Sequence, residues 1–123
     1  METIIIQDTD QDILDILYTA LELEGFRVYG LNSCGEDFIE LIGMARPHVV
    51  MMDYRLSGEN CIRACREIKA RYPHLPVLAL SCNSNINEVY SRSGFDGYIE
   101  KPFELDQLYG ILRKYIPQQD NTL

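Results

Sequence analysis

The chain has 123 residues, and 19 acidic side chains against 11 Lys and Arg give it a formal net charge of −8. That balance argues against direct nucleic-acid binding, which needs a clustered basic surface. No apolar run approaches the roughly 20 residues of a membrane span, and the N-terminus lacks the features of a signal peptide. We therefore expect a single cytoplasmic domain, and a hydrophobic content of 46% is typical of a globular protein.

The N-terminal part of the chain predicts a strand, a helix and a second strand. The β-branched run Thr3–Gln7 predicts a buried strand that ends in the acidic stretch at residues 8–10. Apolar residues then keep helical spacing until Gly25, a typical C-terminal stop for a helix. A second strand is expected at Arg27–Leu31. The apolar stripe of the helix is Ile13, Ile16, Leu17, Ala20 and Leu21.

The middle of the chain continues this alternation. A second helix, closed by Pro47, precedes the apolar run His48–Met52, which predicts a strand ending at Asp53. A third helix follows, and Val77–Leu80, framed by prolines, predicts the fourth strand. The apolar stripes of the two helices are Phe38, Leu41, Ile42 and Ala45, then Cys61, Ala64, Cys65, Ile68 and Tyr72.

The C-terminal part predicts two more helices around a fifth strand. A short helix is expected from Ile86 to Ser93, because Gly94 can end it. The strand is predicted at Gly97–Glu100, and the last helix should stop at Pro117. Its apolar stripe is Leu105, Leu108, Leu112 and Ile116.

Five strands alternating with five helices predict an α/β fold. Because the strands are mostly continuous apolar runs, they indicate a parallel sheet with helices on both faces. Right-handed crossovers then give a single doubly wound, five-stranded domain over residues 1–117, followed by a polar C-terminal tail at residues 118–123.

The chain also has four cysteines: Cys34, Cys61, Cys65 and Cys82. Nothing in the sequence indicates the secretory context in which an even cysteine count predicts disulfides. A zinc site would need a second ligand pair, which His48 and His74 do not supply. Since Cys61 and Cys65 continue an apolar helix stripe, we interpret them as small core residues, with metal or redox chemistry as the alternative.

Polar residues follow the predicted strands. They are Asp8, Thr9 and Asp10 after the first strand, Asp53 after the third, Ser81 after the fourth and Lys101 after the fifth. Because ligands of open α/β sheets bind beyond the carboxyl ends of the strands, we expect these side chains to converge on one rim.

Three segments resemble the receiver domain of two-component response regulators, and the resemblance covers essentially the whole chain. They are His48 to Leu56 (HVVMMDYRL), the pair Leu80-Ser81, and Gly94 to Phe103 (GFDGYIEKPF). The resemblance implies a flavodoxin-like fold with strand order 2-1-3-4-5. It also implies a signalling domain rather than an enzyme, one that at most catalyses its own phosphotransfer and dephosphorylation.

The resemblance further assigns roles to the polar residues. Asp53 would be the phosphoacceptor, Lys101 would pair with a phosphoryl oxygen, and Ser81 would bond another oxygen. Tyr98 matches the aromatic residue that turns inward when that hydroxyl moves. The bond between Lys101 and Pro102 is usually cis in the family.

The same resemblance implies a Mg²⁺ cofactor. Phosphoryl transfer needs charge neutralisation, and a hard cation prefers oxygen ligands. The ligands would be Asp8, Asp53 and the backbone carbonyl of Arg55, with Asp10 or Thr9 as a further contributor.

Receivers typically carry two adjacent acids after the first strand, and here one of them is missing. In an ungapped register Asp8 takes the first position and Thr9 the second, while a one-residue shift would place Gln7 and Asp8 there. A hydroxyl is a weaker ligand than a carboxylate, so the affinity for Mg²⁺ is in question.

Two functions therefore remain open. The first is a phosphorelay receiver that takes its phosphoryl group from a histidine kinase or phosphotransfer protein. Its signal would pass to a downstream protein or to an output domain outside this chain. The alternative is a pseudo-receiver, a phosphorylation-independent interaction module. A flavodoxin-like cofactor binder is disfavoured because acids follow the first strand. The family also leaves homodimerisation through the last helix–strand–helix face open.

Overall fold

The computed structural model describes residues 2–54 and 59–116. Its five parallel strands form one sheet with the order β2-β1-β3-β4-β5, which confirms the predicted topology. The strands are β1 (Thr3–Gln7), β2 (Arg27–Leu31), β3 (Val49–Asp53), β4 (Val77–Ser81) and β5 (Gly97–Glu100). Strand β3 ends at Asp53 as predicted, and β4 extends one residue beyond the predicted Leu80, so Asp53 and Ser81 both belong to the sheet itself.

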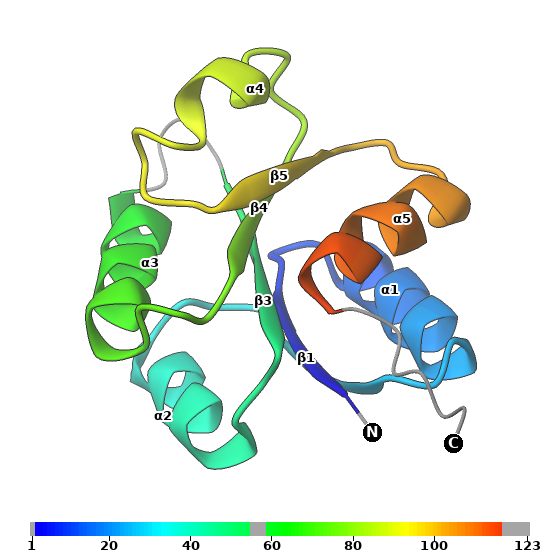
Figure 1. Cartoon of the computed structure of the whole chain (residues 1–123), viewed down its shortest axis with the longest axis horizontal. Coiled ribbons are helices and arrows are strands. Elements are labelled where there is room, and N and C mark those ends of the chain that lie inside the picture. The colour runs from blue at the N-terminus through cyan, green and yellow to red at the C-terminus, as the bar shows by residue number, and fades with distance from the viewer. Residues whose placement is uncertain (1, 55–58, 117–123) are drawn as a thin grey trace, which may run out of the picture.

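Helices cover both faces of this sheet (Figure 1). They are α1 (Gln11–Leu23), α2 (Glu36–Ala45), α3 (Glu59–Arg71), α4 (Ile86–Val89) and α5 (Leu105–Tyr115). Helices α1 and α5 lie on one face, and α2 and α3 lie on the other. The polar C-terminal tail predicted at residues 118–123 lies outside the described residues.

The core is divided by the sheet into two clusters. On β1, Ile4 and Ile6 pack towards α1 and α5, whereas Ile5 packs towards α2 and α3. This alternation follows from the two-residue period of a strand. Every residue of β1, β3 and β4 is buried, as expected for central strands of a parallel sheet covered on both faces.

Gly25 ends α1 as predicted. Its φ is +93°, a left-handed conformation that a side chain would strain. The Gly25 amide donates to the Glu22 carbonyl at 3.0 Å, and the Phe26 amide donates to the Leu21 carbonyl at 3.1 Å. These two bonds form a Schellman motif, and buried Phe26 anchors the start of β2.

Helix α4 is shorter than predicted. Regular α-helix ends at Val89 rather than Ser93, and turns occupy the next residues. The segment still closes at Gly94, whose φ is +99°, and the Phe95 amide donates to the Tyr90 carbonyl at 3.0 Å. Ser91 and Ser93 contribute to this outcome because serine favours turns over helix interiors.

Two residues of the predicted apolar stripes are exposed. Ile16 of α1 is 53% exposed and Leu105 of α5 is 42% exposed, while Leu14, which was not in the predicted stripe, is buried. Leu14 and Leu17 therefore centre the buried face of α1. The buried face of α5 rests on Leu108 and Leu112.

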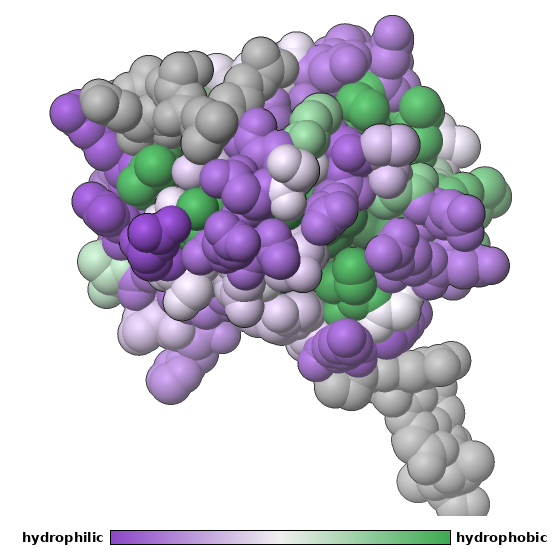
Figure 2. All heavy atoms as spheres, turned by 90° about the horizontal axis from the view of Figure 1, so that it is seen from above, coloured by the Kyte–Doolittle hydropathy of each residue, from purple (hydrophilic) through white to green (hydrophobic). Residues whose placement is uncertain are grey.

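The surface is mostly hydrophilic on the face shown in Figure 2, where hydrophobic residues occur in small separate groups. Within residues 2–54 and 59–116, no helix combines the length and the apolar character needed to cross a membrane.

Candidate functional site

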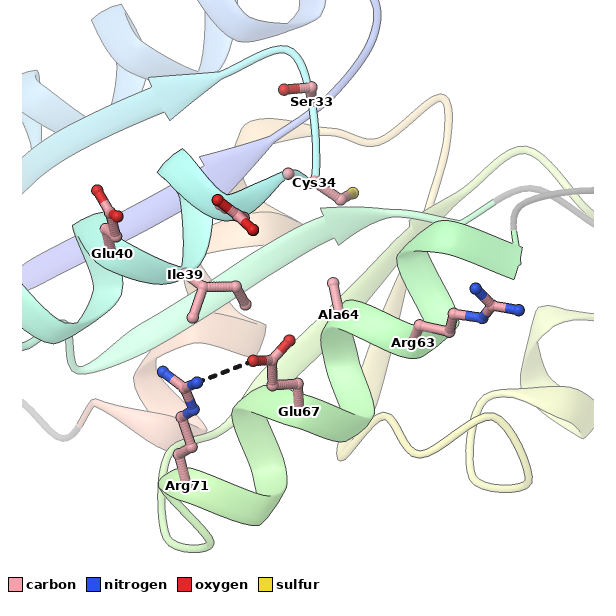
Figure 3. A pocket seen from close by; sticks show the side chains of 10 residues that line it. Ser33, Cys34, Ile39, Glu40, Arg63, Ala64, Glu67 and Arg71 are labelled. Atoms are coloured by element: carbon pink, nitrogen blue, oxygen red, sulfur yellow. Dashed lines mark ion pairs between the residues drawn. The ribbon is translucent and has the colours of Figure 1, made fainter.

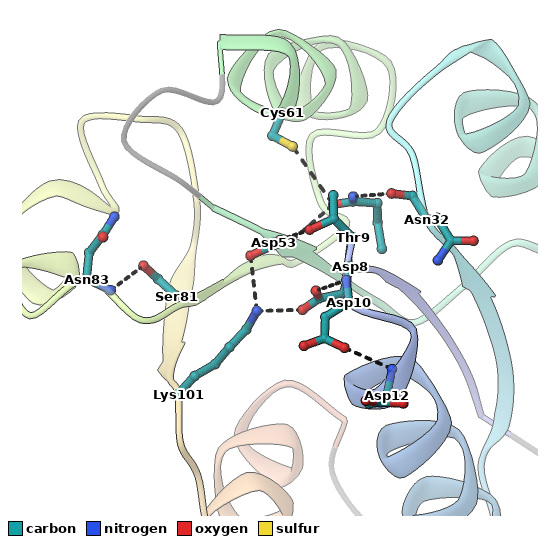
Figure 4. Close-up of polar contacts among 11 residues, drawn as sticks. Asp8, Thr9, Asp10, Asp12, Asn32, Asp53, Cys61, Ser81, Asn83 and Lys101 are labelled. Atoms are coloured by element: carbon teal, nitrogen blue, oxygen red, sulfur yellow. Dashed lines mark hydrogen bonds and ion pairs between the residues drawn. The ribbon is translucent and has the colours of Figure 1, made fainter.

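The candidate site lies where the carboxyl ends of the strands meet (Figure 4). Asp8 follows β1, Asp53 ends β3, and Lys101 follows β5. Strands β1 and β3 are neighbours, although α1, β2 and α2 separate them in sequence. This is the point at which the chain changes direction across the sheet, and sites of doubly wound folds form there.

Lys101 joins the two buried carboxylates of the rim. Its Nζ lies 2.6 Å from Asp8 Oδ2 and 3.1 Å from Asp53 Oδ1. Asp8 is fully buried, Asp53 is 4% exposed and the Lys101 side chain is 10% exposed. Burial by itself would lower the pKa of Lys101, but hydrogen bonds and charges from Asp8 and Asp53 outweigh it and raise that pKa.

The backbone holds Lys101 in this position. Its amide donates to the Ser81 carbonyl at 2.7 Å, so the residue after β5 stays attached to the end of β4. The peptide bond between Lys101 and Pro102 is cis, which is the isomer that the family resemblance implies.

Thr9 and Asp10 occupy different places around this rim. The Thr9 hydroxyl donates to Asp53 Oδ2 at 3.1 Å, so Thr9 lies directly beside the candidate phosphoacceptor. Asp10 is the N-cap of α1, and its carboxylate accepts from the Asp12 amide at 2.9 Å. The Asp10 amide in turn donates to Asp8 Oδ1 at 2.9 Å. Asp8 thus contacts Lys101, and Thr9 contacts Asp53.

The Gln7 side chain holds the backbone of Asp53 in place, a role that was not predicted. Its Oε1 accepts the Asp53 amide at 3.1 Å, and its Nε2 donates to the Asn32 carbonyl at 3.0 Å. The side chain is 1% exposed, so these bonds satisfy an otherwise buried amide. A polar residue ending a fully buried apolar strand was the signal that could have identified it.

Ser81 and Tyr98 lie on the β4–β5 side of the rim. Ser81 is fully buried, and its Oγ accepts the Asn83 amide at 3.0 Å, which starts the loop towards α4. Tyr98 is half-buried on β5 and packs on Tyr90, with ring centroids 5.0 Å apart. Tyr98 therefore connects β5 with the residues that follow α4.

The donors at this rim fit a hard divalent cation such as Mg²⁺. Asp8, Asp53 and Thr9 offer only oxygen atoms, and Mg²⁺ in proteins is commonly held by one or two carboxylates together with water. No cluster of three or more His, Cys, Asp or Glu suited to a metal ion occurs within residues 2–54 and 59–116. The rim therefore provides two carboxylates rather than three. Arg55, whose carbonyl was predicted as a ligand, lies outside the described residues.

Comparison with protein families identifies a match over most of the chain. A model of the response regulator receiver domain matches residues 4–113. This range runs from β1 nearly to the end of α5 and includes all five strands.

Solved structures show the same fold. The response regulator TrrA from Thermotoga maritima, solved in complex with Mg²⁺-BeF, is 21% identical with a TM-score of 0.81, and the match covers 94% of this chain and 99% of that one. The receiver domain of NtrX from Brucella abortus is 28% identical with a TM-score of 0.81 over 94% and 99% of the two chains. A longer NtrX chain from the same organism, in complex with ADP, is 29% identical with a TM-score of 0.83. That match covers 94% of this chain but 27% of the NtrX chain.

Proposed function

Because the chain belongs to the response regulator receiver family of two-component signalling, we propose that Asp53 accepts a phosphoryl group from a histidine kinase or phosphotransfer protein. The observation that carries this proposal is the position of Asp53 at the end of β3, where Lys101 Nζ bridges it to Asp8. The Lys101 ammonium thus lies between two carboxylates at the edge of the sheet.

The transfer is a displacement at phosphorus. An Asp53 carboxylate oxygen forms a P–O bond, the P–N bond to the phosphohistidine breaks, and the products are an acyl phosphate and the free histidine. Lys101 would stay beside Asp53 and pair with a phosphoryl oxygen as a point charge. Bound Mg²⁺ would supply further neutralisation of phosphoryl charge. Asp8 and Asp53 would hold the ion with the Arg55 carbonyl, and Thr9 or Asp10 would contribute directly or through water.

Ser81 and Tyr98 would transmit the effect of Asp53 phosphorylation to the β4–β5 side of the domain. The Ser81 hydroxyl accepts the Asn83 amide, and a hydroxyl that accepts one bond still has a proton to donate to a phosphoryl oxygen. A shift of Ser81 towards Asp53 would draw the loop after β4 with it and alter the packing of Tyr98 on Tyr90.

The readout would be a downstream protein or an output domain outside this chain. In NtrX the matched region is about a quarter of a longer chain, which supports the second arrangement. Homodimerisation through the α4–β5–α5 face is a further arrangement compatible with this reading.

A pseudo-receiver is the second candidate, and Thr9 favours it. The Thr9 hydroxyl bonds Asp53 where the family typically has an acid, so this chain brings one carboxylate fewer to the rim. If that loss abolishes ion binding, the domain would act as a phosphorylation-independent interaction module.

Phosphorylation by a small acyl phosphate with Mg²⁺, followed by intact mass measurement, separates the two candidates. We expect one added phosphoryl group on the wild type, none on Asp53→Asn and the wild-type result on Asp37→Asn. Asp37 is the matched control because it is an exposed carboxylate in the first turn of α2. An unmodified wild type would support the pseudo-receiver, and a modified Asp53→Asn would refute the assignment of Asp53.

A further inference from the structure

Two cysteine side chains meet beside the candidate site. Cys34 lies in the loop between β2 and α2, and Cys61 lies in the first turn of α3. Their sulfur atoms are 2.8 Å apart. Cys61 was predicted to be a core residue of a helix stripe, but it is only partly buried, whereas Cys65 one turn later is fully buried.

The distance between the two sulfurs is suited to covalent bonding. It is shorter than an ordinary van der Waals contact between carbon atoms, about 3.5–4.0 Å, although sulfur is the larger atom. A disulfide bond of about 2.05 Å would require each sulfur to move by less than about 0.5 Å. The β2–α2 loop and α3 bring the two sulfur atoms to 2.8 Å, so bond formation requires a short further approach of the sulfurs.

A groove gives small reagents access to Cys34. It has a volume of about 720 Å³ and runs between α2 and α3, with Cys34 at one end and Arg63, Glu67 and Arg71 along α3 (Figure 3). The lining is mixed, since the apolar side chains of Ile39 and Ala64 lie beside these charged groups. The charged part can accommodate a small hydrophilic oxidant.

The pair should remain reduced until an oxidant is supplied. A hydrogen bond with Cys61, followed by burial and the negative charge of Asp53, raises the pKa of Cys34. The protonated form of Cys34 is therefore favoured at neutral pH, and reaction at this sulfur proceeds through a small thiolate fraction.

We propose that Cys34 and Cys61 form a redox modification site, at which a hydroperoxide converts the two thiols into an intramolecular disulfide. One sulfur attacks a peroxide oxygen, so an S–O bond forms, the O–O bond breaks, and the hydroperoxide is reduced with release of water or an alcohol. The second sulfur then attacks the first, the S–S bond forms and water leaves. Two thiols lose two electrons and two protons in total.

The disulfide would form next to Gln7, the residue that accepts the Asp53 amide. Cys61 Sγ lies 3.9 Å from Gln7 Oε1, the same atom that accepts the Asp53 amide (Figure 4). A disulfide between Cys34 and Cys61 would link the β2–α2 loop to α3 beside this contact with Gln7. The inference concerns the thiol pair alone and does not depend on whether Asp53 is phosphorylated.

Thiol counting in the full chain tests the proposal. The reduced protein is treated with hydrogen peroxide, alkylated under denaturing conditions and measured by intact mass before and after reduction. We expect the wild type to lose about 2 Da and to keep two alkylatable thiols, with all four restored by dithiothreitol. Peptide mapping should link Cys34 to Cys61.

Variants locate the bond. Cys34→Ser and Cys61→Ser should each abolish the mass loss, whereas Cys82→Ser, at an exposed position after β4, should behave as the wild type. Four alkylatable thiols in the treated wild type would overturn the proposal. A bridge that contains Cys65 or Cys82 would also overturn it. Because the wild-type peptide map requires no substitution, the test holds even if a serine variant folds poorly.

Discussion

Among the described residues, the Lys101 side chain balances the negative charge of the rim. It reaches two carboxylates that are almost completely buried, and a buried charge without a partner is far more costly than a paired one. The arrangement still leaves one negative charge in excess, since one ammonium faces two carboxylates. This excess is what an added cation would neutralise.

Replacement of Lys101 tests this balance. Lys101→Met should lower the free energy of unfolding by about 1–3 kcal/mol at pH 7, because it leaves Asp8 and Asp53 facing each other without a cation. Asp8→Asn in the same chain should recover part of this loss by removing one of the two charges. Urea unfolding of the wild type, both single variants and the double variant measures the coupling. Additive losses would show that Lys101 and Asp8 do not interact energetically.

The pKa of Lys101 gives the same interaction a pH dependence. Because that pKa is raised in the folded state, folded protein holds the proton more tightly than unfolded protein does. The stabilisation is therefore fully present below the ordinary value of 10.5 and is lost as pH rises through the folded-state value. The difference in unfolding free energy between wild type and Lys101→Met should shrink above pH 10.5 and stay constant between pH 7 and pH 9. A difference that grows above pH 10.5 would contradict the sign.

At the scale of elements, β5 and α5 pack closely at Gly97, where Tyr115 of α5 approaches the strand. A Cβ on Gly97, the first residue of β5, would collide with the Tyr115 hydroxyl and lie 3.1 Å from Leu78 Cδ2. Tyr115 of α5 donates this hydroxyl to the Asp96 carbonyl at 3.3 Å. The absence of a side chain at position 97 therefore sets how closely the end of α5 approaches the sheet.

Gly97→Ala should destabilise the domain by about 1–3 kcal/mol, the usual cost of overpacking. Tyr115→Phe removes the atom that the new methyl group meets first, so Gly97→Ala combined with Tyr115→Phe should be less destabilised than the sum of the two single variants. Thermal unfolding of the four proteins measures this. Strict additivity would mean that the cost at position 97 arises from Leu78 or from the backbone instead.

The elements also show what local sequence determines. Strand positions were predictable within one residue because β1, β3 and β4 are buried on both faces and thus continuously apolar. The convergence of Asp8, Asp53 and Lys101 followed from the topology of parallel sheets. The contact between Cys34 and Cys61, and the support of Asp53 by Gln7, depend on how loops place residues 27 and 46 positions apart. Local pattern carries no information on such placement. The length of α4 was mispredicted for a similar reason, since turns near Gly94 compete with the helix.

At the scale of the whole molecule, the net charge of −8 acts together with the rim. Added salt screens the general repulsion of an acidic surface and should stabilise the fold modestly, whichever ion is used. Specific ion binding would be a separate contribution, because it would act at the proposed ligands of the rim rather than over the whole surface. Comparison of Mg²⁺ with Na⁺ at equal ionic strength distinguishes the two effects.

We expect MgCl₂ to raise the melting temperature more than NaCl of equal ionic strength. A ligand that binds only the folded state adds about 1.4 kcal/mol when its free concentration is ten times Kd. Thr9→Asp should lower the melting temperature without Mg²⁺, because it adds a third carboxylate to a rim with one lysine, and should raise the gain from Mg²⁺. Thr9→Asn, which changes the shape of the side chain without adding charge, is the matched control and should not show this larger gain. If Thr9→Asp responds to Mg²⁺ no more than wild type, position 9 does not contribute a ligand. In that case, the absence of the acid that the family typically has at this position would not limit ion binding by this chain.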